Sequence, residues 1–409
     1  MIRVDKARLW RDLQRMGEIG ATATGGVRRL ALSAEDKAGR DLFVSWCQNA
    51  GYVVRVDAVG NIYARRDGKG EAAPPVVTGS HLDSQPVAGK YDGPYGVLAG
   101  LEALRTLDQY KVATRRPIDV VVWTNEEGAR FQPPSLAAAV VAGSIAPDAA
   151  FDATDSDGVR FGDALRSIGY AGTIDPVRPS MHCYIEAHIE QGPILELTCR
   201  DIGVVKGVVG VHAYQVELTG QGAHTGTTPT SYRKDALVGA AHIIEGVRKL
   251  AIRYEPKGRA SVAFVQVSPN ARSVIAERVT LTADCRNTDE TELEQMRAEL
   301  LSIFAEAARL ERLALNIHNY WSVSPTHFSS TCIDAIRGAA DRLGYTHDDI
   351  YSGAGHDAMH LARITPAAMI FIPCKDGLSH HEGESITAEQ AEAGANVLLH
   401  ALVELAGSA

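Results

Sequence analysis

Two short apolar segments with a helical pattern between them constrain the fold more than any other feature of the sequence. Residues 74–80 (PPVVTGS) are an apolar run bounded by proline and glycine, and residues 118–123 (IDVVVW) are apolar at nearly every position. Runs of this kind are typical of strands that are buried on both faces of a sheet. Residues 95–107 carry apolar side chains at helical spacing, so the pattern predicts a parallel or mixed α/β sheet.

From residue 211 the pattern changes to that of a half-solvated strand, because apolar and polar residues alternate from His212 to Thr219. The next segment is helical, and its predicted apolar face consists of Leu237, Ala240, Ala241, Ile244, Val247 and Ala251. The chain then continues with strand-like residues 261–267 and 278–284, a helical pattern over 289–310 and a candidate strand at 313–319. This order predicts an inserted α+β (ferredoxin-like) sandwich with its helices on one face of an antiparallel sheet.

After residue 326 the α/β pattern returns, with a predicted helix at 330–343, a strand at 367–372 and a closing helix at 388–405. A chain of 409 residues also exceeds what one hydrophobic core usually supports. We therefore expect a discontinuous α/β domain made of residues 1–210 and 327–409, and an inserted domain made of residues 211–326.

Composition excludes several classes of protein. The net charge of -9 provides no positive field for nucleic acid or an anionic membrane, so we expect neither as a partner. No apolar run is long enough to span a bilayer, and the charged first residues do not resemble a signal peptide, which predicts a cytoplasmic protein. The six cysteines form no CxxC pair, so we expect reduced and mostly buried thiols.

A histidine and two aspartates follow the first predicted strand. His81 and Asp92 offer the imidazole and carboxylate that a divalent metal of the zinc type takes as ligands, and Asp83 can hold the second imidazole nitrogen. Taken alone, the same residues fit a histidine that caps a helix and an aspartate that forms a turn before Gly93. The remaining polar segments decide between these interpretations.

Two adjacent glutamates follow the second predicted strand. Glu126 and Glu127 would repel each other and would be costly to bury unless a cation lies beside them. Metal-assisted hydrolysis requires one carboxylate as a ligand and another as the base that deprotonates water, so we assign Glu127 to the metal and Glu126 to the base. Considered in isolation, the pair also fits a solvated loop with two ordinary acids.

Two further histidines end apolar strand-like segments. His188 lies in EAHIEQGP and His380 lies in GLSHHEGE. Each by itself is as consistent with a packed or surface histidine as with a ligand. Four such polar segments in one chain favour a metal site.

These segments belong to a longer set of motifs. The set comprises GSHLDSQPVAGKYDGPYGVLAGLEAL, TNEEGARF, EAHIEQGP, GQGAHTGTTP, SPNARSVI, DCRNTD, SGAGHDA and GLSHHEGE, and it extends from about Gly20 to the C-terminus. It resembles the amidase and carbamoylase branch of the zinc aminoacylase and carboxypeptidase-like metallohydrolases, which includes N-carbamoyl-L-amino acid hydrolases, β-ureidopropionase of the bacterial and yeast type, and allantoate amidohydrolase. The resemblance implies a metallopeptidase-like three-layer catalytic domain with an inserted lid and dimerisation domain, and hence a homodimer.

The resemblance also implies two divalent metal ions per subunit, either Zn²⁺ or one of Mn²⁺, Co²⁺ and Ni²⁺. It implies that Asp92 bridges the two ions, that His81 and His188 complete one site, and that Glu127 and His380 complete the other. The peptidase branch usually has a carboxylate at the position of His188, so an imidazole there is the mark of the carbamoyl and ureido hydrolases. The motif places the ligand directly after Ser379, which selects His380 over its neighbour His381.

Substrate contacts are implied in the same way. His224 matches a histidine that stabilises the oxyanion of the tetrahedral intermediate, and Arg286 matches the residue that clamps a free substrate carboxylate. The other positions implied to lie near the substrate are Gln191, Asn270, Ser273, Gly353, Gly355 and His356.

Two departures from the family pattern bear on the substrate. Ser273 stands where the family usually has a second asparagine, and residues 137–139 are alanines in a segment that usually contains a Gly-Ser pair. We expect hydrolysis of N-carbamoyl-L-amino acids, with allantoate, another ureide, an acyl amino acid or another amide as the alternative substrate. A catalytically silent metal-binding or scaffold protein is a third possibility, but such a protein is expected to have lost the base or a ligand, and Glu126 and all five ligands are present.

Overall fold

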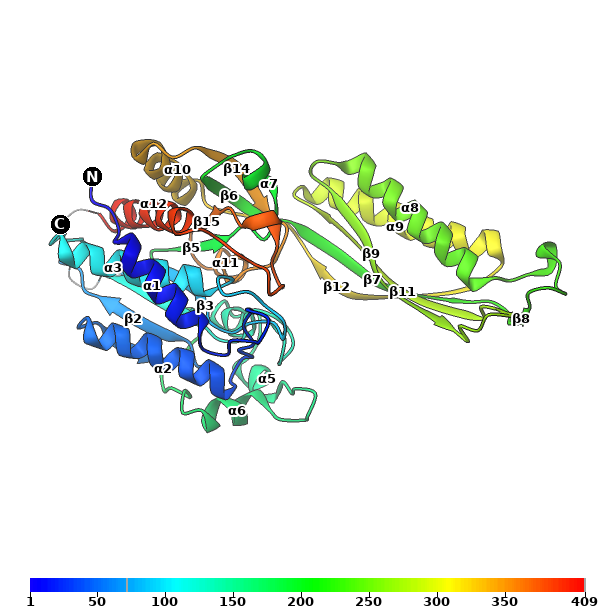
Figure 1. Ribbon diagram of the computed structural model, residues 1–409, viewed down its shortest axis with the longest axis horizontal. Helices are drawn as coiled ribbons and strands as arrows, with labels where there is room; N and C mark the ends of the chain where they lie inside the picture. The colour runs from blue at the N-terminus through cyan, green and yellow to red at the C-terminus, as the bar shows by residue number, and fades with distance from the viewer. Residues whose placement is uncertain (71–72, 408–409) are drawn as a thin grey trace. The chain divides into compact units, whose positions relative to one another are not determined.

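The computed structural model describes residues 1–70 and 73–407 (Figure 1). The chain divides into two compact units, of which the first is Met1–Gly207 with His327–Ala409 and the second is Val208–Thr326. Among the described residues, no helix combines the length and the apolar character needed to cross a membrane.

A nine-stranded sheet forms the centre of the first unit, with the order β1-β2-β4-β3-β5-β15-β6-β13, and β14 pairs with β6. Its strands are β1 Val53–Val56, β2 Ile62–Arg66, β3 Val76–His81, β4 Ile118–Trp123, β5 Cys183–Ile189, β6 Ile202–Val208, β13 Thr326–His327, β14 His347–Ser352 and β15 Ala367–Ile372. The adjacent strands β4, β3, β5 and β15 are parallel, whereas β1, β2 and β6 join antiparallel. The mixed sheet confirms the predicted α/β class, and β4 and β15 have the predicted bounds.

Helices cover both faces of this sheet. Every residue of β3, β4, β5 and β15 is buried, as expected of strands with helices on either side. The helices of the unit are α1 Lys6–Gly17, α2 Ala34–Asn49, α3 Pro94–Gln109, α4 Leu136–Val141, α5 Pro147–Asp152, α6 Phe161–Ser167, α7 Ile194–Leu197, α10 Ser330–Leu343, α11 Asp357–Leu361 and α12 Ala388–Ala406, with a 3-10 turn η2 at Lys375–Gly377. One group, α1, α3, α10 and α12, packs together, and α11 packs on β5 and β15 with α4 beside it (Figure 1).

Local sequence explains where two helices of the first unit begin. Gly93 has a φ of 80°, and Pro94 supplies the first turn of α3, where its missing N–H removes no helical hydrogen bond. Thr387 caps α12 in a reciprocal box with Gln390. The predicted helices over 95–107 and 388–405 are therefore confirmed with slightly longer bounds.

The second unit is a four-stranded antiparallel sheet with two long helices. The sheet has the order β12-β7-β11-β9, and a two-stranded ladder of β8 and β10 lies outside it. The elements are β7 Gly210–Thr219, β8 Ala223–His224, η1 Thr230–Tyr232, α8 Ala236–Tyr254, β9 Arg259–Ser268, β10 Val274–Ile275, β11 Arg278–Asn287, α9 Glu290–Glu311 and β12 Ala314–Val323. Inward side chains of β7, such as Val216 and Leu218, join Ile243 of α8 and Phe304 of α9 in one core. The predicted ferredoxin-like order of strands and helices is confirmed.

The predicted apolar face of α8 is partly wrong. The helix buries Ala240, Val247 and Ala251 as expected, but Leu237 and Ile244 are 47% and 43% exposed. The buried stripe runs instead through Ile243 and Leu250. Because α8 carries apolar residues on more than one side, spacing alone did not identify which side meets the sheet.

Candidate active site

The predicted ligands lie at one edge of the central sheet. His81 ends β3, Glu127 follows β4, His188 lies near the end of β5, and His380 lies beyond β15. These four strands are neighbours and run parallel, so their carboxyl ends meet at the same edge. In open α/β sheets this edge is where ligands bind.

Asp92 stands between two groups of candidate ligands. Its Oδ1 lies 3.1 Å from Nε2 of His188 and 3.4 Å from Nε2 of His81. Its Oδ2 lies 3.5 Å from Nε2 of His380, which in turn is 3.2 Å from Oε2 of Glu127. Within each group the potential ligand atoms lie within 4.8 Å of one another, so each group can hold a metal ion. The five predicted ligands therefore form two clusters that share one carboxylate.

The charge balance of the clusters fits cations. Asp83, Asp92 and Glu126 are at least nine-tenths buried, and in residues 1–70 and 73–407 no lysine or arginine forms an ion pair with any of them or with Glu127. Burial of several carboxylates is costly when none of them has a lysine or arginine in an ion pair, and among them the charge of the buried Arg29 favours the ionised form of Asp83 without pairing with it. A donor set of imidazoles and carboxylates suits zinc and its neighbours in the first transition series. The residues present thus fit divalent metal ions.

Main-chain carbonyls orient two of the candidate ligands. Nδ1 of His81 is 2.9 Å from the carbonyl oxygen of Asp83, and Nδ1 of His188 is 2.9 Å from that of Ile189. These contacts place the proton on Nδ1 and leave a lone pair on each Nε2 that can coordinate, although Nε2 of His188 accepts the N–H of Gly93 at 3.3 Å in the metal-free protein. Gly93 is required beside His81, because a Cβ there would lie 2.4 Å from the imidazole ring.

Asp83 acts differently from the expectation. Its carboxylate was predicted to hold the second nitrogen of His81, but Oδ1 lies 3.9 Å from Nδ1, and the carbonyl oxygen of Asp83 makes that contact instead. The carboxylate accepts hydrogen bonds from the main-chain N–H groups of Glu126 and Glu127, each at 3.2 Å. Asp83 therefore joins the loop after β3 to the loop after β4.

Glu126, the predicted base, is buried beside the first cluster. Its Oε2 lies 3.5 Å from Nε2 of His81. Burial raises the pKa of Glu126 to about 8, an effect that His81 opposes and that Glu127 and Asp83 increase. A carboxylate whose pKa lies near neutrality is suited to accept and return a proton.

Three residues at the site have strained backbones. Asn125, Gln191 and His380 have φ values of 58°, 57° and 54°. These values lie in the left-handed region, which residues other than glycine rarely adopt. Asn125 precedes the predicted base, His380 is a predicted ligand, and Gln191 donates a hydrogen bond to the predicted ligand Asp92. Such strain gathers where the fold holds functional groups in a fixed geometry.

The other predicted residues of the first unit lie around these clusters. Gln191 donates from Nε2 to Oδ2 of Asp92 at 2.8 Å, and its own Oε1 is buried without a partner in the described residues. The buried His356 ring packs on His188 with ring centres 4.6 Å apart, and its Nε2 contacts Oγ of Ser352 at 3.0 Å. Gly353 and Gly355 belong to the same loop as His356, between β14 and α11.

The remaining predicted residues lie in the second unit. His224 of β8 pairs with Val274 of β10, and its Nδ1 accepts hydrogen bonds from the main chain of Gly226 and Thr227. Ser273 accepts from Thr225 through its carbonyl oxygen at 3.2 Å, so the structure brings the loops of His224 and Ser273 together.

Asn270 and Arg286 belong to the same unit as His224. Asn270 lies between β9 and β10 with a φ of 51°, and Arg286 lies near the end of β11 and donates from Nη2 to Asp284 at 2.9 Å.

Sequence reasoning missed three residues that support the clusters. Glu384 accepts hydrogen bonds from the main-chain N–H of Tyr91 and Asp92, Gln85 donates to both carboxylate oxygens of Glu127, and Ser135 donates to Oε1 of Glu126. Glu384 and Gln85 stand inside the quoted motifs GLSHHEGE and GSHLDSQ, so their segments were identified without a role for these side chains.

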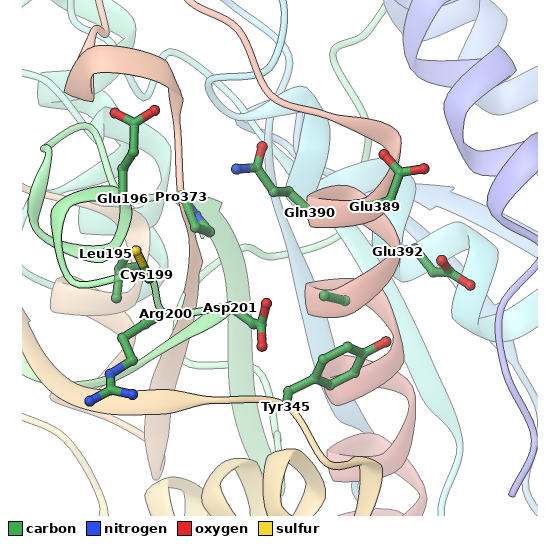
Figure 2. A pocket seen from close by; sticks show the side chains of 11 residues that line it. Leu195, Glu196, Cys199, Arg200, Asp201, Tyr345, Pro373, Glu389, Gln390 and Glu392 are labelled. Atoms are coloured by element: carbon green, nitrogen blue, oxygen red, sulfur yellow. The ribbon is translucent and has the colours of Figure 1, made fainter.

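A separate hollow of about 430 Å³ in the first unit contains none of the predicted site residues (Figure 2). Its acidic side chains already have partners within the chain. Glu196 accepts from the main chain of Asp376, Asp201 accepts from Thr346, and Lys6 pairs with both Glu389 and Glu392. We assign the chemistry to the edge of the sheet and not to this hollow.

Comparisons with known proteins agree with this geometry. The profile of peptidase family M20/M25/M40 matches residues 77–404. The chain is 44% identical over 407 residues to an N-carbamoyl-L-amino-acid amidohydrolase of Rhizobium meliloti, with 99% of this chain and 97% of the relative covered. It is 31% identical over 393 residues to an allantoate amidohydrolase of Bacillus subtilis (strain 168), with 96% and 95% covered. A crystal structure of an amidase of the hydantoinase/carbamoylase family from Burkholderia multivorans matches with a TM-score of 0.97 and 48% identity, covering 99% of this chain and 98% of that one.

Proposed function

The chain belongs to peptidase family M20/M25/M40, in its hydantoinase/carbamoylase branch of amidohydrolases, and on that premise we propose that it hydrolyses N-carbamoyl-L-amino acids. The products are the L-amino acid, ammonia and carbon dioxide. The observation that carries the proposal is the pair of clusters that share Asp92, with an imidazole at His188 in the first of them. An imidazole at that position is the mark that separates the carbamoyl and ureido hydrolases from the peptidase branch of the family that the sequence resembles.

Two divalent cations fit these clusters, one held by His81, Asp92 and His188 and the other by Asp92, Glu127 and His380. When bound, such ions polarise a carbonyl group and lower the pKa of water. Glu384, Ser379 and Gln191 fix Asp92 through hydrogen bonds to its main chain and to its Oδ2. Asp92 is thereby held in one orientation toward both clusters.

Glu126 moves the proton. It accepts a proton from the attacking water, whose oxygen forms the new bond to the carbamoyl carbon, and it returns that proton to the amino nitrogen as the carbon–nitrogen bond breaks. The carbamic acid that leaves breaks down to ammonia and carbon dioxide, so one water is consumed in the whole reaction. In the metal-free protein burial raises the pKa of Glu126 to about 8, which suits the half of the transfer in which it holds the proton, and bound cations would favour the carboxylate that accepts one.

The roles of the substrate-binding residues follow the resemblance to the family. Arg286 binds the free carboxylate, because a planar guanidinium can make two parallel hydrogen bonds to it. His224 stabilises the oxyanion. Its Nδ1 accepts two main-chain hydrogen bonds, so the ring proton lies on Nε2, where it can be donated. Gln191 contributes its unpartnered Oε1 as an acceptor for the substrate amide. Asn270, Ser273 and the loop of Gly353, Gly355 and His356 complete the binding residues.

Allantoate or another ureide is the second candidate substrate. Ser273 replaces an asparagine of the family pattern, and its shorter side chain reaches less far toward a substrate. Residues 137–139 are buried alanines at the start of α4, where the family pattern has polar groups. The similarity to an allantoate amidohydrolase supports the same alternative.

The second unit is also proposed as the surface of a homodimer. α8 exposes an apolar strip made of Leu237, Val238, Ile244 and Ile252, which are 47%, 41%, 43% and 53% exposed. The exposed Glu245 and Arg248 of the same helix lie among these four residues, and exposed apolar side chains surrounded by polar ones are a feature of interaction surfaces. A self-complementary contact through one helix face is the usual geometry of a twofold dimer.

The deciding experiment measures ammonia release by the protein loaded with Zn²⁺ or Mn²⁺, with and without a chelator. The panel contains N-carbamoyl-L-amino acids, their D-isomers, allantoate and acyl amino acids with amine release as the readout. Chelator-sensitive release that is fastest with an N-carbamoyl-L-amino acid supports the proposal. Fastest release from allantoate supports the second candidate, and no release from any ureido compound would remove both.

A further inference from the structure

Two arginines outside the proposed metal clusters are buried in the first unit. Arg29 is 1% exposed and Arg40 is 0% exposed. Burial of a guanidinium is costly unless most of its N–H groups are hydrogen-bonded. The positions of their acceptors therefore indicate what these side chains hold in place.

Arg29 is attached to the loop after β3. Its Nε donates to the carbonyl oxygen of Leu82 at 2.6 Å, and its Nη1 donates to the carbonyl oxygens of Met16 and Ile19. The main chain of Arg29 donates to Oγ of Ser84 at 2.8 Å and accepts from the N–H of Ser84 at 2.9 Å. Leu82 lies between His81 and Asp83, so Arg29 fixes the residue that connects a proposed ligand to the aspartate beside it.

Arg40 is attached to the start of the loop after β4. Its Nη2 donates to Oγ1 of Thr124 at 3.2 Å, and its Nη1 donates to the carbonyl oxygen of Gly60 at 2.8 Å. Thr124 has a second hydrogen bond, which its main-chain N–H donates to Oδ1 of Asn61 at 3.0 Å. Thr124 is two residues before Glu126, so Arg40 fixes the chain where it leaves the strand toward the base.

Helix α2 connects the two arginines. Asp36 pairs with Arg40 one turn away at 2.8 Å with both side chains fully buried, and it also accepts from the N–H of Leu32. Gly39 lies between Asp36 and Arg40 on α2 and faces Arg29, which precedes the helix. A Cβ at Gly39 would be 3.2 Å from Cδ of Arg29. Burial lowers the pKa of Arg29 to about 10, while Asp36 and Asp83 favour its charged form, so it remains a cation at neutral pH.

We propose that Arg29 and Arg40, of which Arg40 is held by Asp36, are positioning residues that hold the loop after β3 and the loop after β4 in register. The two loops meet where the Asp83 carboxylate accepts the N–H groups of Glu126 and Glu127. Displacement of the loop after β3 would move His81 relative to Asp92. Displacement of the loop after β4 would move Glu126 and Glu127 relative to His81 and Asp92. The arrangement thus sets the metal affinity and the orientation of the Glu126 carboxylate. In the described residues, the side chains of Arg29, Asp36 and Arg40 make no contact with a proposed ligand.

The test compares Arg29→Lys and Arg40→Lys with Arg65→Lys. Arg65 makes two hydrogen bonds to Asp119, near the opposite end of β4 from Thr124, so it is a matched structural arginine without a link to the site. The readouts are the dissociation constant for Zn²⁺ by competition with a chromophoric chelator, kcat and KM, and the thermal midpoint. Residues that orient ligands from outside the coordination shell typically change affinity or activity by about 10-fold to 100-fold.

We expect Arg29→Lys to weaken Zn²⁺ binding by about tenfold or more, and Arg40→Lys to lower kcat by about tenfold with KM nearly unchanged. Arg65→Lys is expected to lower the thermal midpoint without either effect. The proposal fails if all three variants lose stability alike while Zn²⁺ affinity and kcat stay at the level of the unmodified protein.

Two further points keep the test decisive. If the lysine variants do not fold, Asp36→Asn replaces them, because it keeps the size of the side chain and removes the charge that pairs with Arg40. An unchanged Zn²⁺ affinity and kcat in Asp36→Asn then overturns the proposal. The kcat readout rests on the proposed function, but Zn²⁺ affinity does not need a substrate, so a wrong substrate assignment and a wrong positioning role give different results.

Discussion

Ser135 donates its hydroxyl hydrogen to Oε1 of Glu126 at 3.2 Å, and the N–H of the same serine donates to the carbonyl oxygen of Glu126 at 2.7 Å. The serine side chain does not cap α4, although it stands at the N-cap position, so its hydroxyl is directed to the glutamate alone. Two contacts from one residue hold the proposed base by its carboxylate and by its main chain.

Removal of this hydroxyl is expected to slow turnover. A hydrogen bond to a charged group contributes about 1.5–3 kcal/mol, and water replaces part of it, so we expect Ser135→Ala to lower kcat by about tenfold. KM should stay nearly constant, since Ser135 is not proposed to contact substrate. Steady-state kinetics of Ser135→Ala and of the control Ser144→Ala, whose hydroxyl contacts Arg363, measure this. Equal kcat values for the two variants would contradict a role for Ser135.

Glu126→Gln should abolish most hydrolysis while the protein still folds and binds metal. The amide keeps the size of the side chain but cannot accept and return a proton, and general acid–base catalysis typically contributes roughly 100-fold to 10,000-fold. The measurements are kcat and the metal content by elemental analysis. Retained activity would exclude Glu126 as the base, and loss of metal would reassign it as a ligand.

His380 and its neighbour His381 provide a matched pair for the second cluster. Nε2 of His380 contacts Oε2 of Glu127, whereas Nδ1 of the exposed His381 accepts from the N–H of Gly383. We expect His380→Ala to lose one metal equivalent and most activity, and His381→Ala to change neither by more than about twofold. Metal titration of both variants checks this, and the reverse result would exchange the two assignments.

Metal binding should release protons at neutral pH. In the metal-free protein the hydrogen bond to Glu127 raises the pKa of His380 to about 9, so His380 carries a proton that must leave before it coordinates. Apparent affinity for the ion is therefore expected to increase with pH up to about 9. Calorimetric titrations in buffers with different ionisation enthalpies count the released protons, and the release should be smaller in His380→Ala. No dependence of the measured heat on the buffer would contradict the prediction.

A charge placed on the exposed strip of α8 should separate a dimer. Ile244→Lys puts an ammonium group among the exposed apolar side chains of α8, and burial of an unpaired charge at an interface is strongly unfavourable. Light scattering after size exclusion is expected to give twice the mass of the chain for the unmodified protein and a single chain for the variant. Leu197→Lys, at an exposed position of the first unit, is the control. A monomeric unmodified protein would remove the proposed dimer.

Much of the fold could be predicted because its central strands are apolar at nearly every position. β4 and β15 were predicted with their observed bounds from that property alone. Peripheral strands such as β1 (VVRV) and β14 (HDDIYS) were not predicted, because they are short and only partly buried and their pattern resembles that of loops. The prediction of the buried side of α8 was partly wrong for the opposite reason, since the helix has more apolar residues than it buries.

The candidate site could be predicted at the level of the motifs but not at the level of main-chain contacts. The sequence indicates that His81 and Asp83 act together, yet it does not indicate that the contact with the imidazole uses the carbonyl oxygen of Asp83. Arg29 and Arg40 were not identified for the same reason, because most of their acceptors are carbonyl oxygens, which every residue provides. Side-chain spacing carries no information about such partners.

The order of strands in the central sheet has a consequence for how the protein is made. β15 lies between β5 and β6, so the last strand of the sheet to be synthesised fits between two strands that leave the ribosome about 160 to 180 residues earlier. Until it arrives, β5 lacks a neighbour on one side, its unpaired main chain is open to other strands, and His380 is not yet in place. Pairing over such a separation is slow, because the entropy of closing a long loop is lost before the contacts that stabilise the pair can form. The β5 edge is therefore unpaired until β15 has been synthesised, and His380 is the last of the five proposed ligands to join the site.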